Sequence, residues 1–364
     1  MPYINHPLPK YPVKEDVWDI LKNEKRPIVV YGMGNGADKL IERFSKYGIE
    51  IADFFASAGF VRGHFFHGKR VKSLEEIKAE HSEFVIVLSF ASNREEVINM
   101  LAEIDGKHQM YVPDMPIASC EYFDKELYNL CYEDIKKAYE SLSDEESKAV
   151  FSSVVNYRIS GKMKFLLETY SEKYEKYDIL NRKKIETVID GGAYNGDTAK
   201  EAVLNFKGVK RIYALEPDAR NFKKLSKYAG EETKCEIIPI NSALYSEDGL
   251  SSFSGSGNRN STISGTASHE FSKSEVSLVK IDSLTSGRVD YIKLDVEGAE
   301  YEALLGARET IAKHHPSMSV SLYHKSRDIF SLINYLREEY PEYKLYLRRT
   351  RCVPAWEIDL VMTY

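Results

Sequence analysis

The segment that most constrains this chain is a short apolar strand that stops at an acid and enters a glycine-rich turn. Residues 188–198 read VIDGGAYNGDT, so the strand ends at Asp190 and a helix is expected to open at Thr198. This order places bare backbone and a helix N-terminus beside a ligand, as in doubly wound α/β sheets. The segment therefore predicts an α/β fold with a ligand at this turn.

A second acid stands where such a sheet holds a ribose. The apolar segment 211–215 ends at Glu216, which lies 20 positions after Gly196. An acid at the end of the second strand can accept hydrogen bonds from both ribose hydroxyls, which predicts a nucleoside-containing cofactor. The turn reads Asp-x-Gly-x-x-x-Gly, not Gly-x-Gly-x-x-Gly. This form suits S-adenosylmethionine, because that cofactor has no pyrophosphate for a glycine loop to hold.

A third segment places charges on a strand that should be buried. Lys293, Asp295 and Glu297 share one side of the expected strand 291–296. A central parallel strand is normally apolar on both faces, so three charges are costly there unless they are paired or used. Asp295 and Glu297 fall at the carboxyl end, where open α/β sheets bind ligands. The alternative is a structural Lys293–Asp295 pair, with Glu297 capping the next helix.

A histidine is expected at the same edge. The predicted strand 318–323 delivers His324 and Lys325 there, with Asp328 one helical turn further on. Histidine titrates near neutral pH and can take a proton from a hydroxyl. His324 is therefore either a general base or a packing residue.

These motifs resemble the FkbM family of S-adenosylmethionine-dependent methyltransferases over about residues 183–364. The run KLDVEGAE at 293–300 is the most distinctive piece. The resemblance implies a class I, seven-stranded, Rossmann-like sheet and O-methylation, often of a sugar hydroxyl in a glycan or natural product. It places the glycine turn under the methionine part of the cofactor, Glu216 on the ribose, and Ser242 and Ala243 beside the adenine. The expected cofactor-binding residues are Asp190, Gly191, Gly192, Tyr194, Gly196, Asp197, Thr198, Glu216, Pro217, Ser242, Ala243 and Asp295.

The expected catalytic residues are His324, Asp295 and Lys293, with His324 the first choice of base and Asp295 the second. If His324 is the base, the rate should rise through an ionisation near the ordinary histidine pKa. Asp295 and Glu297 could instead hold a divalent metal, but no further carboxylate is clustered with them in the sequence. The last strands depart from the family pattern, because Asp359 stands where an apolar residue is expected.

The chain divides by pattern into three parts. Residues 1–117 predict a smaller Rossmann-like domain, with strands at 28–31, 49–55, 84–90 and 109–112. Its Gly32–Ala37 turn and Asp53 resemble the nucleotide-binding-like modules of sugar-modifying enzymes. That domain is either an empty scaffold or oligomerisation unit, or it binds a nucleotide or nucleotide-sugar. Residues 118–182 predict a helical connector, and residues 183–364 the methyltransferase domain, which we expect to bind cofactor even in a fragment beginning near Ser143.

Composition limits the classes of partner. The 364 residues carry a net charge of −6, which gives no general attraction to nucleic acid. The basic patch 348–351 is read as a solvated strand edge, and the longest strongly apolar run, 84–91, is too short to span a bilayer. The segment 251–264 is either a flexible loop or a lid. We therefore expect a soluble cytoplasmic protein with a small-molecule or glycan acceptor, and a homo-oligomer stays open.

Two other functions stay open on the sequence alone. The first is a nicotinamide- or nucleotide-sugar-binding enzyme that works through the Gly32–Ala37 turn. The second is a non-catalytic binding module, which the intact motifs at Asp190 and Glu216 argue against.

Overall fold

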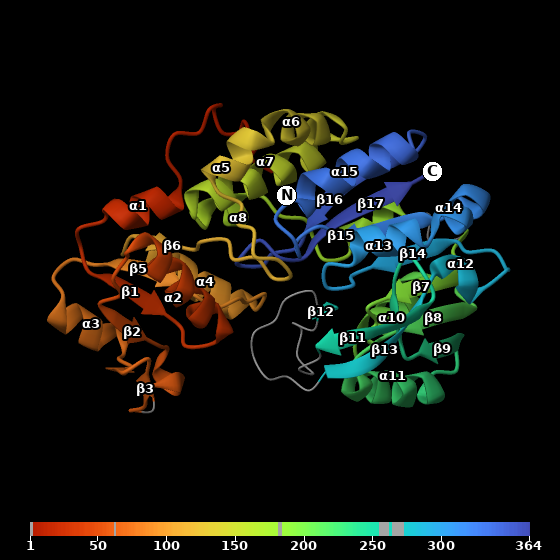
Figure 1. Cartoon of the computed structure of the whole chain (residues 1–364), viewed down its shortest axis with the longest axis horizontal. Helices are drawn as coiled ribbons and strands as arrows, with labels where there is room; N and C mark the ends of the chain where they lie inside the picture. The colour runs from red at the N-terminus through yellow and green to blue at the C-terminus, as the bar shows by residue number, and fades with distance from the viewer. Residues whose placement is uncertain (1–2, 62, 181–183, 255–261, 264–272) are drawn as a thin grey trace.

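The structure is a computed structural model that describes residues 3–61, 63–180, 184–254, 262–263 and 273–364. Two main sheets with flanking helices are joined by a helical segment, and two smaller sheets accompany them (Figure 1). The predicted α/β fold is confirmed. Within the described residues, no helix is both long enough and apolar enough to cross a bilayer.

The first unit is a parallel four-stranded sheet with the order β2-β1-β5-β6. Its central strands are apolar and buried throughout, which is typical of a parallel sheet covered on both faces. Gly48 closes α2 in the left-handed region, and Ser73 and Glu76 form a capping box on α3. The elements are α1 Val17–Asn23, β1 Ile28–Tyr31, α2 Asn35–Tyr47, β2 Asp53–Phe55, η1 Ala58–Phe60, β3 Phe65–Phe66, β4 Lys69–Arg70, α3 Leu74–Glu80, β5 Val85–Leu88, α4 Glu95–Asp105 and β6 Met110–Tyr111.

Residues 118–182 supply the helices that connect the two sheets. They are α5 Lys125–Leu130, α6 Tyr132–Glu140, α7 Glu145–Ser160, α8 Lys164–Glu168 and α9 Glu175–Ile179. α7 is buried along most of its length and packs on β16, while α6 packs on α15. The connector lies above and between the two sheets in Figure 1. The exact domain boundaries stay a prediction.

The second sheet has the order β16-β17-β15-β14-β7-β8-β9. Its five strands from β15 to β9 run parallel, and β17 pairs antiparallel with both β15 and β16. This sheet therefore has seven strands, five of them parallel. The strands are β7 Thr187–Gly191, β8 Arg211–Leu215, β9 Glu236–Ile240, β14 Tyr291–Leu294, β15 Ser317–Ser321, β16 Lys344–Arg349 and β17 Ile358–Thr363. The helices are α10 Asp197–Asn205, α11 Ala219–Glu231, α12 Ile281–Leu284, α13 Glu300–Leu305, α14 Arg308–His314 and α15 Asp328–Glu339.

A small third sheet joins β10 Ser242–Leu244, β13 Lys273–Val279, β11 Gly249–Ser254 and β12 Thr262–Ile263. The sequence also favours an additional strand at 274–281, and β13 occupies most of that range. The segment predicted to be a loop or lid, 251–264, is partly strand, because β11 and β12 occupy its two ends. Its middle, residues 255–261, lies outside the described residues.

The basic patch 348–351 is not a solvated edge, so that prediction is wrong. Arg349 is fully buried, and its guanidinium donates to the carbonyls of Leu166 and Thr169. Arg348 is also buried and forms an ion pair of 2.7 Å with Asp144. The sequence shows the charges, but not the connector that brings carbonyls and carboxylates to them.

The acid at Asp359 has a similar explanation. β17 pairs with both of its neighbours through this position, so the unusual residue does not disturb the sheet. The Nζ atom of Lys176 lies 2.7 Å from the Asp359 carboxylate. The connector thus supplies the cation that lets an acid stand in this strand.

Candidate functional site

A cavity of about 770 Å³ opens at the carboxyl ends of the strands of the second sheet. Open α/β sheets bind ligands at this edge. The predicted residues that line it are Gly192, Tyr194, Asp197, Thr198, Glu216, Pro217, Ser242, Ala243, Lys293, Asp295, Glu297 and His324. Three predicted residues, Asp190, Gly191 and Gly196, are not in the lining, although each lies within two residues of a position that lines it.

The turn after β7 needs glycine for a steric reason. Gly192 has φ +76°, and a Cβ atom on it would lie 1.8 Å from the carbonyl oxygen of Asp295. Gly196 has φ +92° and immediately precedes α10. The turn therefore passes directly against the end of β14, which joins the two strongest sequence motifs in one wall of the cavity.

Asp190 fixes the turn from behind. It is buried, and the Oγ1 hydroxyl of Thr198 donates a hydrogen bond of 2.5 Å to its carboxylate. Burial raises the pKa of Asp190, which Lys293 and the Thr198 hydroxyl oppose. This bond ties the end of β7 to the start of α10.

Glu216 lies where the sequence predicts a ribose-binding acid. It directly follows β8, and its two carboxylate oxygens accept hydrogen bonds from the backbone N–H groups of Tyr194 (2.9 Å) and Asp218 (2.8 Å). Burial raises the pKa of Glu216 to about 7. Each carboxylate oxygen has a second lone pair, so the group can accept from ribose hydroxyls without losing its backbone partners.

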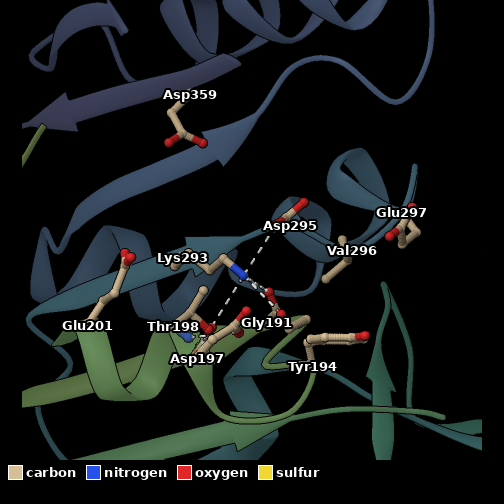
Figure 2. Close-up of polar contacts among 12 residues, drawn as sticks. Gly191, Tyr194, Asp197, Thr198, Glu201, Lys293, Asp295, Val296, Glu297 and Asp359 are labelled. Atoms are coloured by element: carbon tan, nitrogen blue, oxygen red, sulfur yellow. Dashed lines mark hydrogen bonds and ion pairs between the residues drawn. The ribbon is translucent and has the colours of Figure 1, made fainter. Parts of the chain in front are cut away.

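Lys293 holds the turn and the acids together, as Figure 2 shows. Its Nζ atom donates to the carbonyl oxygens of Gly191 (3.2 Å) and Gly192 (3.0 Å). It also lies 3.5 Å from the carboxylates of Asp190 and Asp295. Burial alone would lower the pKa of Lys293, but Asp295 and Asp190 raise it, so Lys293 is a cation. The Lys–Asp pair considered from the sequence exists, as part of a larger network that shapes the cavity.

His324 lies in the cavity wall among carboxylates and is almost fully enclosed. Its Nδ1 atom is 2.9 Å from Glu300, and its Nε2 atom is 3.5 Å from both Asp295 and Glu297. The side chain is 1% exposed, and Nε2 is enclosed. Burial would lower the pKa of His324, but Glu300 and the other two carboxylates raise it to about 10.

This environment corrects the predicted ionisation of His324. A ring with a pKa of about 10 is protonated at neutral pH, so no titration of His324 is expected near the ordinary histidine pKa. The sequence reasoning did not single out Glu300, which lies 2.9 Å from His324. The position of Glu300 in the run 293–300 was the sequence signal that could have identified it. The inward direction of the His324 ring has no sequence signature.

Asp295 and Glu297 offer the accessible carboxylates beside this cation. Their side chains are 32% and 29% exposed. The Tyr323 hydroxyl donates to Asp295 (3.1 Å), and Lys293 and His324 overcome burial to lower the pKa of Asp295. Burial instead raises the pKa of Glu297 to about 8.

The metal hypothesis for Asp295 and Glu297 gains no geometric support. Across the part of the chain that the structure describes, the close group of three ligands suitable for a metal is Asp53, Glu80 and His81, in the first unit. There, Lys72 already lies 2.7 Å from Asp53.

Asp53 is not placed as a ribose-binding acid either. It begins β2 and pairs in register with Val29, whereas the Gly32 turn follows the opposite end of β1. The sequence predicted a strand at 49–55 with Asp53 near its end, but the strand begins at Asp53. Its carboxylate is bound by Lys72 and by His81 at 2.8 Å.

Backbone strain gathers around the cavity. Tyr194, Glu297 and Glu357 have positive φ values of 47°, 52° and 57°. All three line the cavity. Left-handed conformations at residues other than glycine are unfavourable and cluster at functional sites, which supports a functional role for this surface.

Comparisons with known proteins agree with this geometry. Residues 190–348 match the model of a family described as "Methyltransferase FkbM domain". A search of curated proteins finds no significant match. The solved FkbM methyltransferase from Methylobacillus flagellatus KT is 18% identical, with a TM-score of 0.68 over 93% of this chain and 90% of that one.

The similarity to the Methylobacillus protein concerns the fold, and it includes both sheets. An rRNA methylase from Streptococcus thermophilus is similar over 51% of this chain and 89% of that one, at 12% identity and a TM-score of 0.32. The family match covers the turn at Asp190, Glu216 and the 293–300 run. The chain therefore carries a methyltransferase domain of the FkbM family, whose cofactor is S-adenosylmethionine.

Proposed function

We propose that the protein transfers the methyl group of S-adenosylmethionine to a hydroxyl of a sugar, in a glycan or a sugar-containing metabolite. The observation that carries this proposal is one continuous cavity, lined by the FkbM cofactor motifs and by polar and aromatic side chains beyond them. We also propose that the seven-stranded sheet is a class I methyltransferase sheet, with the domain limits 1–117, 118–182 and 183–364. Because S-adenosylmethionine is a cytoplasmic metabolite, we place the reaction in the cytoplasm.

The cofactor would occupy the part of the cavity between the glycine turn and β10. Glu216 would accept from the ribose hydroxyls, and Ser242 and Ala243 would flank the adenine. The methionine part would lie over the turn of Gly192 and Tyr194. All five residues line the same cavity, which supports this placement.

Methyl transfer is an in-line displacement. The acceptor oxygen forms a bond to the methyl carbon while the carbon–sulfur bond breaks, and both electrons of that bond stay on sulfur to give S-adenosylhomocysteine. The acceptor oxygen then loses its proton to a base. Much of the rate would come from holding the two reactants in line.

We propose Asp295 as this base, because His324 is protonated and enclosed. Asp295 follows β14, its backbone carbonyl lies against the turn of Gly192, and its side chain is partly exposed in the cavity lining. The imidazolium of His324 would then hold the Asp295 and Glu297 carboxylates in place. Lys293 would position the turn, through the Gly191 and Gly192 carbonyls.

Methyl-labelled S-adenosylmethionine, a panel of glycans and mass spectrometry would test the function. Label on a sugar oxygen is the expected result. Label on a non-carbohydrate acceptor would contradict the sugar assignment while leaving the methyltransferase assignment in place. A parallel thermal-shift measurement with S-adenosylhomocysteine, NAD and a sugar nucleotide would identify the ligand that stabilises the fold.

A further inference from the structure

We propose that the cavity has an outer subsite, walled in part by the first α/β unit, that binds additional sugar units of the acceptor. The acceptor would then be an oligosaccharide chain and not a single sugar. This inference rests on the proposed function and deepens it. We define the outer subsite by Asn93–Glu95, Tyr170–Lys173, Thr350–Arg351 and Trp356–Glu357, all of which line the cavity.

The first wall comes from a different sheet than the cofactor turn. Asn93, Arg94 and Glu95 lie just after β5 and at the start of α4, yet they line the same cavity as Glu216. The carboxyl end of β5 therefore faces the carboxyl edge of the second sheet across the cavity. This position gives the first unit a role in the site even though Asp53 is engaged elsewhere.

The first wall is fixed by hydrogen bonds to the loop between β16 and β17. Ser92 and Val353 form an antiparallel bridge, with Ser92 N donating to Val353 O at 2.8 Å and Val353 N donating to Ser92 O at 3.0 Å. Arg351 Nη2 donates to the Asn99 side chain at 2.9 Å. The same loop contributes Arg351 and Trp356 to the cavity, so the two walls are built as one unit.

The connector forms the third wall, and a buried arginine holds it. Arg349 donates to the Thr169 carbonyl at 2.7 Å, and Ser171 N donates to the Arg349 carbonyl at 2.7 Å. The segment that these bonds fix, Tyr170–Lys173, continues into the cavity lining. Three parts of the chain that lie far apart in sequence therefore converge on the outer subsite.

The chemistry of the outer subsite favours a neutral, hydroxyl-rich ligand. Its described walls carry basic and acidic side chains together with amide and hydroxyl groups, so they can both donate to and accept from sugar hydroxyls. The mixture of charges gives little preference for a polyanion, and the polar walls give little for an apolar chain. The indole of Trp356 provides an apolar face for the C–H side of a sugar ring. The basic side chains of the outer subsite are Arg94, Lys173 and Arg351, and the acidic ones are Glu95, Glu172 and Glu357. The amide and hydroxyl groups belong to Asn93, Ser171 and Thr350.

The two tryptophans make this inference directly measurable. Trp18 is buried in the first unit, whereas Trp356 lines the cavity. The full-length variant Trp18→Phe leaves Trp356 as the single indole reporter. The probes are the shortest glycan that wild-type protein methylates, its single-sugar form, and forms extended by one and two units, each titrated with S-adenosylhomocysteine present.

We expect affinity to rise by about tenfold or more from the single sugar to the extended chains. Asn93→Ala and Arg351→Ala should each remove most of this gain, while affinity for the single sugar and for S-adenosylhomocysteine stays unchanged. Lys107→Ala is the matched control, because it is exposed near the other end of α4 and does not line the cavity.

Equal affinity for the single sugar and the extended chains would overturn the outer subsite, as would a gain that persists in both variants. Either result would leave the proposed function standing. Methylation of a non-carbohydrate acceptor, with no methylation of any sugar, would instead contradict the proposed function. The failure of the outer subsite and the failure of the proposed function are therefore distinguishable. Arg351→Ala could disturb the docking of the first unit, so Asn93→Ala, which removes no described interdomain bond, gives the decisive comparison.

Discussion

At the residue scale, Glu216 links cofactor binding to pH. Burial raises the pKa of its carboxyl to about 7 in the free protein, whereas the ribose hydroxyls need the ionised form as acceptor. Binding therefore requires loss of a proton below this pKa, so affinity should fall as pH falls. We expect S-adenosylhomocysteine to bind about tenfold more weakly at pH 6 than at pH 8 by calorimetry. Glu216→Gln should bind weakly with little pH dependence, and a wild-type affinity that is flat over this range would contradict the assignment.

The base assignment makes a second residue-scale prediction. The pKa of Asp295 is lowered, so the residue is ionised throughout the neutral range. Asp295→Asn should reduce kcat by about 10²–10⁴-fold, with a smaller effect on S-adenosylhomocysteine affinity. Glu297→Gln is the matched control and should retain most of the activity. If the wild-type rate instead rises with a midpoint near pH 8 and Glu297→Gln abolishes that rise, the base is Glu297.

Sequence reasoning succeeds at this scale where backbone geometry demands a residue type. Gly192 follows from the strand–turn–helix pattern, because the turn leaves no room for a Cβ atom. The position of Glu216 also follows from it, because the acid comes directly after the end of β8. It fails at His324, because the protonation of a buried ring depends on three carboxylates whose directions no local pattern encodes. The placement of His324 at the cavity was predictable, but its charge was not.

At the element scale, the turn between β7 and α10 depends on its contact with the end of β14. In Gly192→Ala, the new methyl group would meet the Asp295 carbonyl, and the left-handed backbone would add about 1–2 kcal/mol of strain. We expect a large loss of S-adenosylhomocysteine affinity and a lower Tm. Gly230→Ala is the control, because nothing lies within 4 Å of its Cβ position inside α11, and it should gain up to about 1 kcal/mol of stability. Normal cofactor affinity in Gly192→Ala would show that the turn does not carry the site.

Whole strands were easier to predict than their surroundings. Apolar runs with flanking turn residues mark the seven strands of the second sheet, because burial on both faces demands such runs. The environment of β16 was mispredicted, since a run of arginines is typical of a solvated surface. Arg349 is buried because its donors meet carbonyls of the connector, a long-range pairing that a local pattern cannot show.

At the scale of the whole molecule, the two sheets share one buried core. The continuous cluster includes Val29 of the first sheet, Val154 of the connector and Ile292 of the second sheet. Arg158 on α7 joins the parts further, through an ion pair with Asp114 (3.1 Å) and a hydrogen bond to the Ser326 carbonyl (3.1 Å). The sequence pattern shows two sets of βαβ motifs and therefore predicts two sheets. It does not show the interface between the sheets, because hydrophobic periodicity is local. A fragment beginning near Ser143 would lose α6 from the surface of α15, so we expect it to be less stable than the full-length protein. That such a fragment still binds cofactor when it folds stays a prediction.

This shared core predicts a single cooperative unfolding transition. Trp356→Phe leaves Trp18 to report on the first unit, and Trp18→Phe leaves Trp356 to report on the second. In each variant the fluorescence midpoint should coincide with the midpoint from far-ultraviolet circular dichroism. S-adenosylhomocysteine at 100 times its Kd should stabilise the native state by about 2.7 kcal/mol and shift both reporters together, although it contacts only the second unit in our proposal.

Asp114→Asn should lower both midpoints, because it leaves the Arg158 cation buried without its partner, at a cost of about 3–5 kcal/mol. A cofactor shift seen by Trp356 alone would mean that the two units unfold separately, and the first unit would then be a tethered module and not a structural wall of the site.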